Sequence, residues 1–164
     1  MSESETKEQP APARREMTLE EYTGLVGQEI ALSKWFEMTQ ARIDAFATAT
    51  EDWSYIHIDP ERAAPVFGGT VAHGFLTLSM IGAMAIDALP KIAGRRMAVN
   101  YGFDKVRLIN PVPSGSFLRG RFVLTDIVDR RPGEIISRIK LTIEIKDIGK
   151  PALVADWLYH SRLS

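Results

Sequence analysis

The chain has 164 residues, 45% hydrophobic and 25% charged, so it is long enough for one globular domain and too apolar to be disordered throughout. Twenty basic and 21 acidic side chains give a net charge of -1, which favours neither nucleic acid nor an anionic membrane as a partner. The absence of cysteine excludes disulfides, thiolate nucleophiles and cysteine-ligated metal sites. Its three histidines, His57, His73 and His160, lack the clustered spacing of a metal cage.

Residues 1–16 are polar, contain proline and alanine, and lack the apolar stretch of an export signal. We expect this segment to be a disordered tail, because it has too few large apolar side chains to offset the entropy of ordering. A cytoplasmic location is the default expectation for such a chain. The ordered domain is expected to cover residues 17–164.

The first part of this domain is expected to contain short elements. Thr18 and Glu21 have the spacing of a capping box, which predicts a short helix that ends within residues 24–27. Four elements are expected next: a strand over 29–36, a helix capped by Thr39 and ending at Ala49, a loop over 50–60 and a short helix over 61–66.

The segment from Ala63 to Ile86 contains no Asp, Glu, Lys or Arg. Proline and glycine residues interrupt its first half, which leaves about 15 helical residues from Phe75 to Leu89. A membrane-spanning helix needs about 20 apolar residues. We therefore expect a helix that is buried nearly all round inside the fold and ends at Pro90.

After Pro90 the apolar residues change from helical to alternating spacing. This pattern predicts consecutive strands over 97–109, 117–128, 135–146 and 152–160, with a bulge near Asp104. Long strands after one apolar helix predict an α+β fold in which an antiparallel sheet wraps around that helix. A single sheet leaves apolar surface uncovered, so we expect the chain to form a dimer.

Two segments contain candidate chemistry. Asp52 precedes His57 in the expected loop, and a carboxylate and an imidazole that converge on one water can move a proton on and off carbon. The alternative is a surface acid and a histidine satisfied by a backbone carbonyl. Gly74 lies where the apolar helix begins, so its backbone N–H could stabilise an oxyanion, or the residue could serve only as a turn glycine. His73 is expected to be a cap or packing residue rather than a catalyst.

The combined motif resembles a known family. A D-x4-H-x-D-P sequence begins at Asp52, and A-H-G ends at Gly74 before the apolar helix. This pattern is similar to the hydratase-2 motif of MaoC-like, (R)-specific enoyl-CoA hydratases with the hot-dog fold, and the resemblance extends from about Met17 to the end. It implies that Asp52 and His57 activate the water that is added to a trans-2-enoyl thioester, and that the Gly74 amide is the oxyanion donor. It implies neither a metal nor a redox cofactor.

The chain departs from the family pattern in its loop and in its helix. The usual Asn-Pro of the motif is replaced by Ser54-Tyr55, and a helix position that is often serine is Gly82. This variant more closely resembles the NodN-like branch of the family. The aromatic rings of Trp53 and Tyr55 are candidates for the acyl pocket.

The leading expectation is a homodimer, or a dimer of dimers, that interconverts trans-2-enoyl and (R)-3-hydroxyacyl thioesters of coenzyme A. A hot-dog acyl-CoA thioesterase is one alternative, although it would not explain why His57 accompanies Asp52. A non-catalytic thioester-binding protein is another. Neither nucleic acid nor a membrane is expected as a partner.

Overall fold

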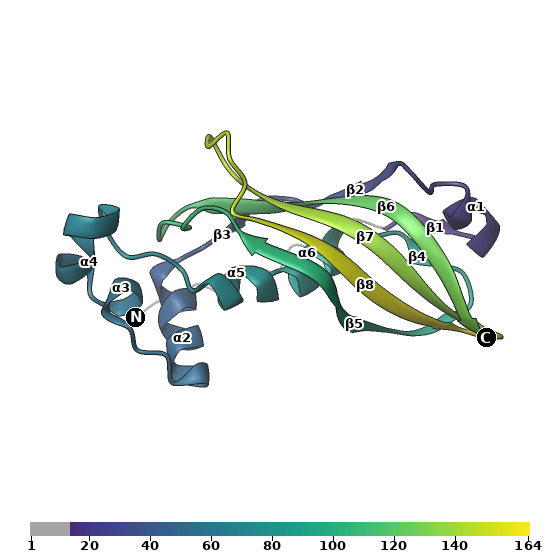
Figure 1. Cartoon of the computed structure of the whole chain (residues 1–164), viewed down its shortest axis with the longest axis horizontal. Helices are drawn as coiled ribbons and strands as arrows, with labels where there is room; N and C mark the ends of the chain where they lie inside the picture. Colours follow the sequence, from purple (N-terminus) through teal and green to yellow (C-terminus); the bar gives the residue numbers. More distant parts are fainter. Residues whose placement is uncertain (1–13) are drawn as a thin grey trace, which may run out of the picture.

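The computed structural model describes residues 14–164, in which a six-stranded antiparallel sheet curves around a central helical segment (Figure 1). The sheet contains β2 (Glu29–Leu32), β3 (Phe36–Glu37), β5 (Arg95–Leu108), β6 (Phe117–Arg131), β7 (Glu134–Ile145) and β8 (Leu153–Leu163). Its strand order is β2-β6-β7-β8-β5, and β3 also pairs with β6. The expected α+β architecture, with an antiparallel sheet wrapped around a helix, is confirmed.

The helices are α1 (Leu19–Thr23), α2 (Gln40–Thr50), α3 (Tyr55–Ile58), α4 (Pro60–Phe67), α5 (Gly74–Ser79) and α6 (Ile81–Ala88). Helices α5 and α6 run along the inner face of the sheet, α2 to α4 lie at one of its ends, and α1 lies at the other (Figure 1). Two short strands, β1 (Glu16–Met17) and β4 (Lys91–Ile92), form a separate parallel pair. Ordered structure therefore begins slightly before residue 17, while the part of the expected tail at 1–13 lies outside the described residues.

The capping box is present as expected. The Thr18 hydroxyl accepts the N–H of Glu21 at 3.1 Å, and the Glu21 carboxylate accepts the N–H of Thr18 at 2.7 Å. The strand expected over 29–36 is instead interrupted after Leu32. Here the Ser33 hydroxyl accepts the N–H of Gly120 at 2.9 Å, so a side chain replaces one regular bond of the sheet.

The loop expected over 50–60 contains a helix that the sequence pattern did not indicate. Only four residues form α3, which is too short to show helical periodicity. The next helix, α4, begins at Pro60 because the Asp59 carboxylate caps it by accepting the N–H of Arg62 at 3.1 Å. The chain between α2 and α5 therefore contains more helical structure than the sequence predicted.

The central helix differs from expectation in two respects. It is divided into α5 and α6 at Met80, which keeps a right-handed helical conformation, so the two segments follow each other closely. It is also not buried all round, because Phe75 and Ile86 are 73% and 63% exposed while Met84 is fully buried against the sheet. Among the described residues, no helix is both long and apolar enough to cross a membrane.

The inner face of the sheet supplies much of the core. Along β7, the odd-numbered residues from Ile135 to Ile145 are buried, whereas Arg138 and Lys140 point to solvent, as the alternating pattern predicted. The expected bulge at Asp104 is confirmed by a register shift between β5 and β8. Trp157 on β8 belongs to this core, with 1% of its surface exposed.

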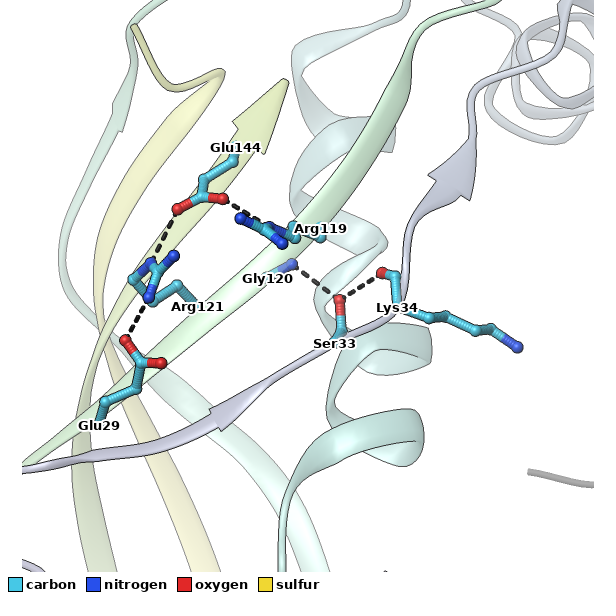
Figure 2. A network of polar contacts seen from close by, with 7 residues as sticks. All are labelled: Glu29, Ser33, Lys34, Arg119, Gly120, Arg121 and Glu144. Atoms are coloured by element: carbon cyan, nitrogen blue, oxygen red, sulfur yellow. Dashed lines mark hydrogen bonds and ion pairs between the residues drawn. The ribbon is translucent and has the colours of Figure 1, made fainter. Parts of the chain in front are cut away.

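The outer face of the sheet carries a network of charged side chains (Figure 2). The Glu144 carboxylate on β7 accepts hydrogen bonds from Arg119 at 2.6 Å and from Arg121 at 2.8 Å, both on β6. Arg121 also pairs with Glu29, so the network connects three strands. Partial burial by itself would raise the pKa of Glu144, but the hydrogen bonds from the two arginines outweigh it and lower that pKa.

Candidate active site

Three separate segments bring acidic and imidazole groups together at one end of the sheet. Asp52 follows the last turn of α2, His57 lies in α3, and His73 immediately precedes α5. One carboxylate oxygen of Asp52 and one ring nitrogen from each histidine all lie within 4.8 Å of one another. The expected Asp52–His57 pair is therefore close in space, and His73 joins it.

His57 is oriented by the backbone of the segment that leads into α5. Its Nδ1 lies 2.6 Å from the carbonyl oxygen of Val71, and the residue is only 8% exposed. A carbonyl oxygen can only accept, so Nδ1 carries a proton, and in the neutral imidazole the lone pair is on Nε2. The backbone contact and a role as a base are therefore compatible, because each uses a different ring nitrogen.

Gln40, at the start of α2, holds the backbone around His57. Its side-chain N–H group donates to the carbonyl oxygen of His57 at 2.7 Å, and its side-chain oxygen accepts the hydroxyl of Thr70 at 2.5 Å. The amide thus links α2, α3 and the segment before Val71. The sequence contained no signal for this role, since it depends on contacts 17 and 30 residues away.

His73 is almost fully buried and contacts both members of the pair. Its Nε2 lies 3.0 Å from the backbone oxygen of Asp52, and its ring stacks on that of His57 with centroids 3.7 Å apart and an interplanar angle of 27°. The sequence pattern predicted a capping or packing role for this residue. Its position in the A-H-G motif was the one available signal of another role.

The same three residues offer atoms of the kinds that bind metal ions, within 4.8 Å of one another. The lone pair of an imidazole lies in the plane of its ring, and two ligands of one metal need lone pairs that converge on it. The His57 and His73 rings are instead stacked face to face, so their ring planes lie side by side rather than pointing to a common centre. This arrangement fits proton transfer by His57 better than metal coordination.

A cavity of about 380 Å³ lies next to His57. Its lining includes Gly74 and Thr77 from α5 and Leu108 from the end of β5. As the first residue of α5, Gly74 has a backbone N–H without an acceptor one turn earlier. The structure therefore places the expected oxyanion donor and the imidazole on the wall of one cavity.

Among the described residues, Asp52, Trp53 and Tyr55 do not line this cavity. Trp53 is 52% exposed, and Tyr55 is 36% exposed with its ring 4.5 Å from the guanidinium of Arg62. Gly82 instead lines a hollow between α6, β5 and β8. Contact of Trp53 and Tyr55 with an acyl chain stays a prediction.

Comparison with known proteins shows the family of the chain. The MaoC like domain model matches residues 21–146. Nodulation protein N of Rhizobium meliloti is 47% identical over 145 residues, covering 87% of this chain and 90% of that protein. The 3-hydroxyacyl-thioester dehydratase Z of Mycobacterium tuberculosis is 39% identical over 131 residues, covering 79% of this chain and 86% of that protein.

The solved structures agree with this assignment. The (R)-hydratase from A. caviae matches with a TM-score of 0.67 at 23% identity, over 85% of this chain and 96% of that chain. This likeness confirms the hot-dog fold, and the match to nodulation protein N agrees with the NodN-like resemblance of the motif. Because the family model and both relatives cover most of its length, the chain belongs to the MaoC-like hydratase and dehydratase family.

Proposed function

We propose that the protein interconverts trans-2-enoyl and (R)-3-hydroxyacyl thioesters by adding or removing water. The observation that carries this proposal is that the Asp52 carboxylate lies close to the His57 imidazole, and that His57 and Gly74 line the same cavity. Support also comes from the 39% identity to a protein named as a 3-hydroxyacyl-thioester dehydratase. Coenzyme A is the proposed carrier of the acyl group.

The proposed reaction uses His57 and Asp52 as an acid–base pair around one water molecule. The unprotonated Nε2 of His57 and the Asp52 carboxylate bind the water, and the pair removes one of its protons. The water oxygen bonds to the β-carbon as the carbon–carbon double bond shifts its electrons toward the thioester carbonyl. The α-carbon then takes a proton from the same pair, so one molecule of water is added in total.

The Gly74 N–H is the proposed donor to the thioester oxygen. Negative charge develops on this oxygen when water attacks the β-carbon, and a fixed backbone donor at a helix start stabilises it. Absence of a side chain at Gly74 lets an oxygen approach the amide closely. In the dehydration direction, the same donor stabilises the enolate that forms when the α-proton is removed.

A second copy of the chain is the proposed partner. Strand β5 pairs only with β8 among the described strands, so its other edge has unpaired backbone groups. Met97, Val99 and Tyr101 on β5 are exposed, as are Phe75 and Ile86 on the central helix. Burial of this apolar surface favours a homodimer, which sedimentation at micromolar concentration tests.

The proposed activity can be separated from its alternatives with trans-2-butenoyl-CoA. A hydratase removes the absorbance of the conjugated thioester without releasing a free thiol. A thioesterase releases coenzyme A, which a thiol reagent detects, and a binding protein does neither. Thiol release, or no reaction with any member of a chain-length panel, would contradict the proposed function.

A further inference from the structure

His73 is a buried polar residue that the proposed reaction does not use. Only 2% of its surface is exposed, and its ring packs against two other rings, those of His57 and Phe46, with the Phe46 centroid 4.9 Å away. It precedes α5, yet its side chain makes no capping hydrogen bond to that helix. A cap would be the ordinary reason for a polar residue at this position, so the side chain requires another explanation.

One edge of the His73 ring is bonded to the backbone of Asp52. Because a carbonyl oxygen can only accept, Nε2 carries the proton and donates it over 3.0 Å. The Asp52 side chain is exposed, and its Oδ1 accepts a long hydrogen bond of 3.4 Å from the N–H of Ser54. The bond from His73 is therefore the stronger of these two constraints on Asp52.

One face of the His73 ring supports His57. The two rings stack at 3.7 Å, while the carbonyl of Val71 holds the edge of the His57 ring through Nδ1. Together these contacts fix the plane of the His57 imidazole and limit its rotation, so its Nε2 points in one direction. The other ring nitrogen of His73, Nδ1, is buried without a hydrogen-bond partner among the described residues. The ring is therefore held by the hydrogen bond from Nε2–H and by its contacts with the neighbouring rings.

We propose that His73 is a positioning residue that fixes Asp52 and His57 relative to each other. This inference rests on the proposed hydration of enoyl thioesters. Histidine combines the two contacts in one side chain: glutamine keeps an N–H donor but lacks a ring, and phenylalanine keeps a ring but lacks the donor. Since a displacement of about 1 Å can cost about 100-fold in rate, loss of either contact lowers turnover.

The test uses His73→Gln, His73→Phe and His73→Ala, with His160→Gln as a matched control. His160 is a partly buried histidine on β8 that pairs with Glu134. We expect kcat for hydration to fall about 10-fold to 100-fold in the Gln and Phe variants and further in the Ala variant, with KM changed less than about threefold. The two single-contact variants thus partly rescue the Ala variant, whereas the control keeps wild-type values.

Amide hydrogen exchange supplies a measurement that does not depend on activity. In His73→Phe, amides within residues 52–57 exchange at least about 10-fold faster than in the wild type, whereas those of β6 and β7 do not change. Unchanged kcat in the Gln and Phe variants, or unchanged exchange in residues 52–57, would overturn the positioning role. If the wild-type protein hydrates no thioester, the proposed function fails, and the exchange result by itself then decides whether His73 holds this segment.

Discussion

Replacing Gly74 by alanine tests whether this glycine serves a ligand or only the packing of the helix. A β-carbon at position 74 would lie 2.4 Å from Cδ1 of Leu108 and 3.4 Å from its Cγ and Cδ2. Carbon atoms in contact prefer separations of about 3.5–4.0 Å, so the Leu108 methyl must retreat by about 1 Å or more. Leu108 is 55% exposed and can turn, so we expect Gly74→Ala to cost about 1 kcal/mol in the free energy of unfolding.

The effect on activity should exceed the effect on stability. The new methyl group remains beside the amide on the cavity wall, where it obstructs the thioester oxygen, so kcat/KM should fall at least about 10-fold, or about 1.4 kcal/mol. Adding Leu108→Ala relieves the contact within the protein, and Leu108→Ala alone supplies the baseline. We expect urea unfolding of the double variant to show recovered stability, while the hydration assay shows no recovery of kcat/KM relative to that baseline. Recovered activity would mean that the glycine serves packing alone, and would refute the oxyanion role.

Three further predictions concern the catalytic pair, the charged network and the dimer interface. Asp52→Asn and His57→Ala should each lower turnover at least about 100-fold, with an unchanged circular dichroism spectrum. The double variant should lose little more turnover than the worse single variant. Near-normal turnover in both single variants would exclude a catalytic pair. Folding lowers the pKa of Glu144, so its stabilisation is present above the unfolded-state pKa and is lost as pH falls through the folded-state value. Glu144→Gln should therefore lower the free energy of unfolding by about 1 kcal/mol near pH 7, and should leave it unchanged near pH 2. An equal decrease in the free energy of unfolding at both pH values would contradict a stabilising role of the network. Ile86→Lys should shift sedimentation toward the monomer without unfolding the chain, because this side chain is 63% exposed; an undisturbed dimer would exclude this face as the interface.

The strands and the paired chemical groups could be predicted because their signals are local or are carried by a motif. The alternation along β7 shows directly which side chains face the core. The capping box at Thr18 and Glu21 needs only residues three apart. The spacing of Asp52 and His57, read together with the A-H-G motif, indicated a site that the structure brings together.

The residues that support this site could not be predicted in the same way. Gln40 reaches His57 and Thr70 only because α2 packs beside α3, and its bonds to them span 17 and 30 positions. The contact of His73 with the Asp52 backbone spans 21 positions. The break after Leu32 likewise depends on Gly120, 87 residues beyond Ser33. Such contacts follow from the tertiary arrangement, which hydrophobic periodicity does not specify.

The stereochemistry of water addition shows whether Asp52 and His57 act together on one water molecule. The protein is incubated with a trans-2-enoyl-CoA in deuterated water, and the configuration at both new centres of the product is determined. One water held by Asp52 and His57 delivers oxygen and hydrogen to the same face of the double bond, so syn addition is expected. We expect an (R)-3-hydroxyacyl thioester formed by syn addition, whereas an (S)-product or anti addition would contradict the proposed mechanism.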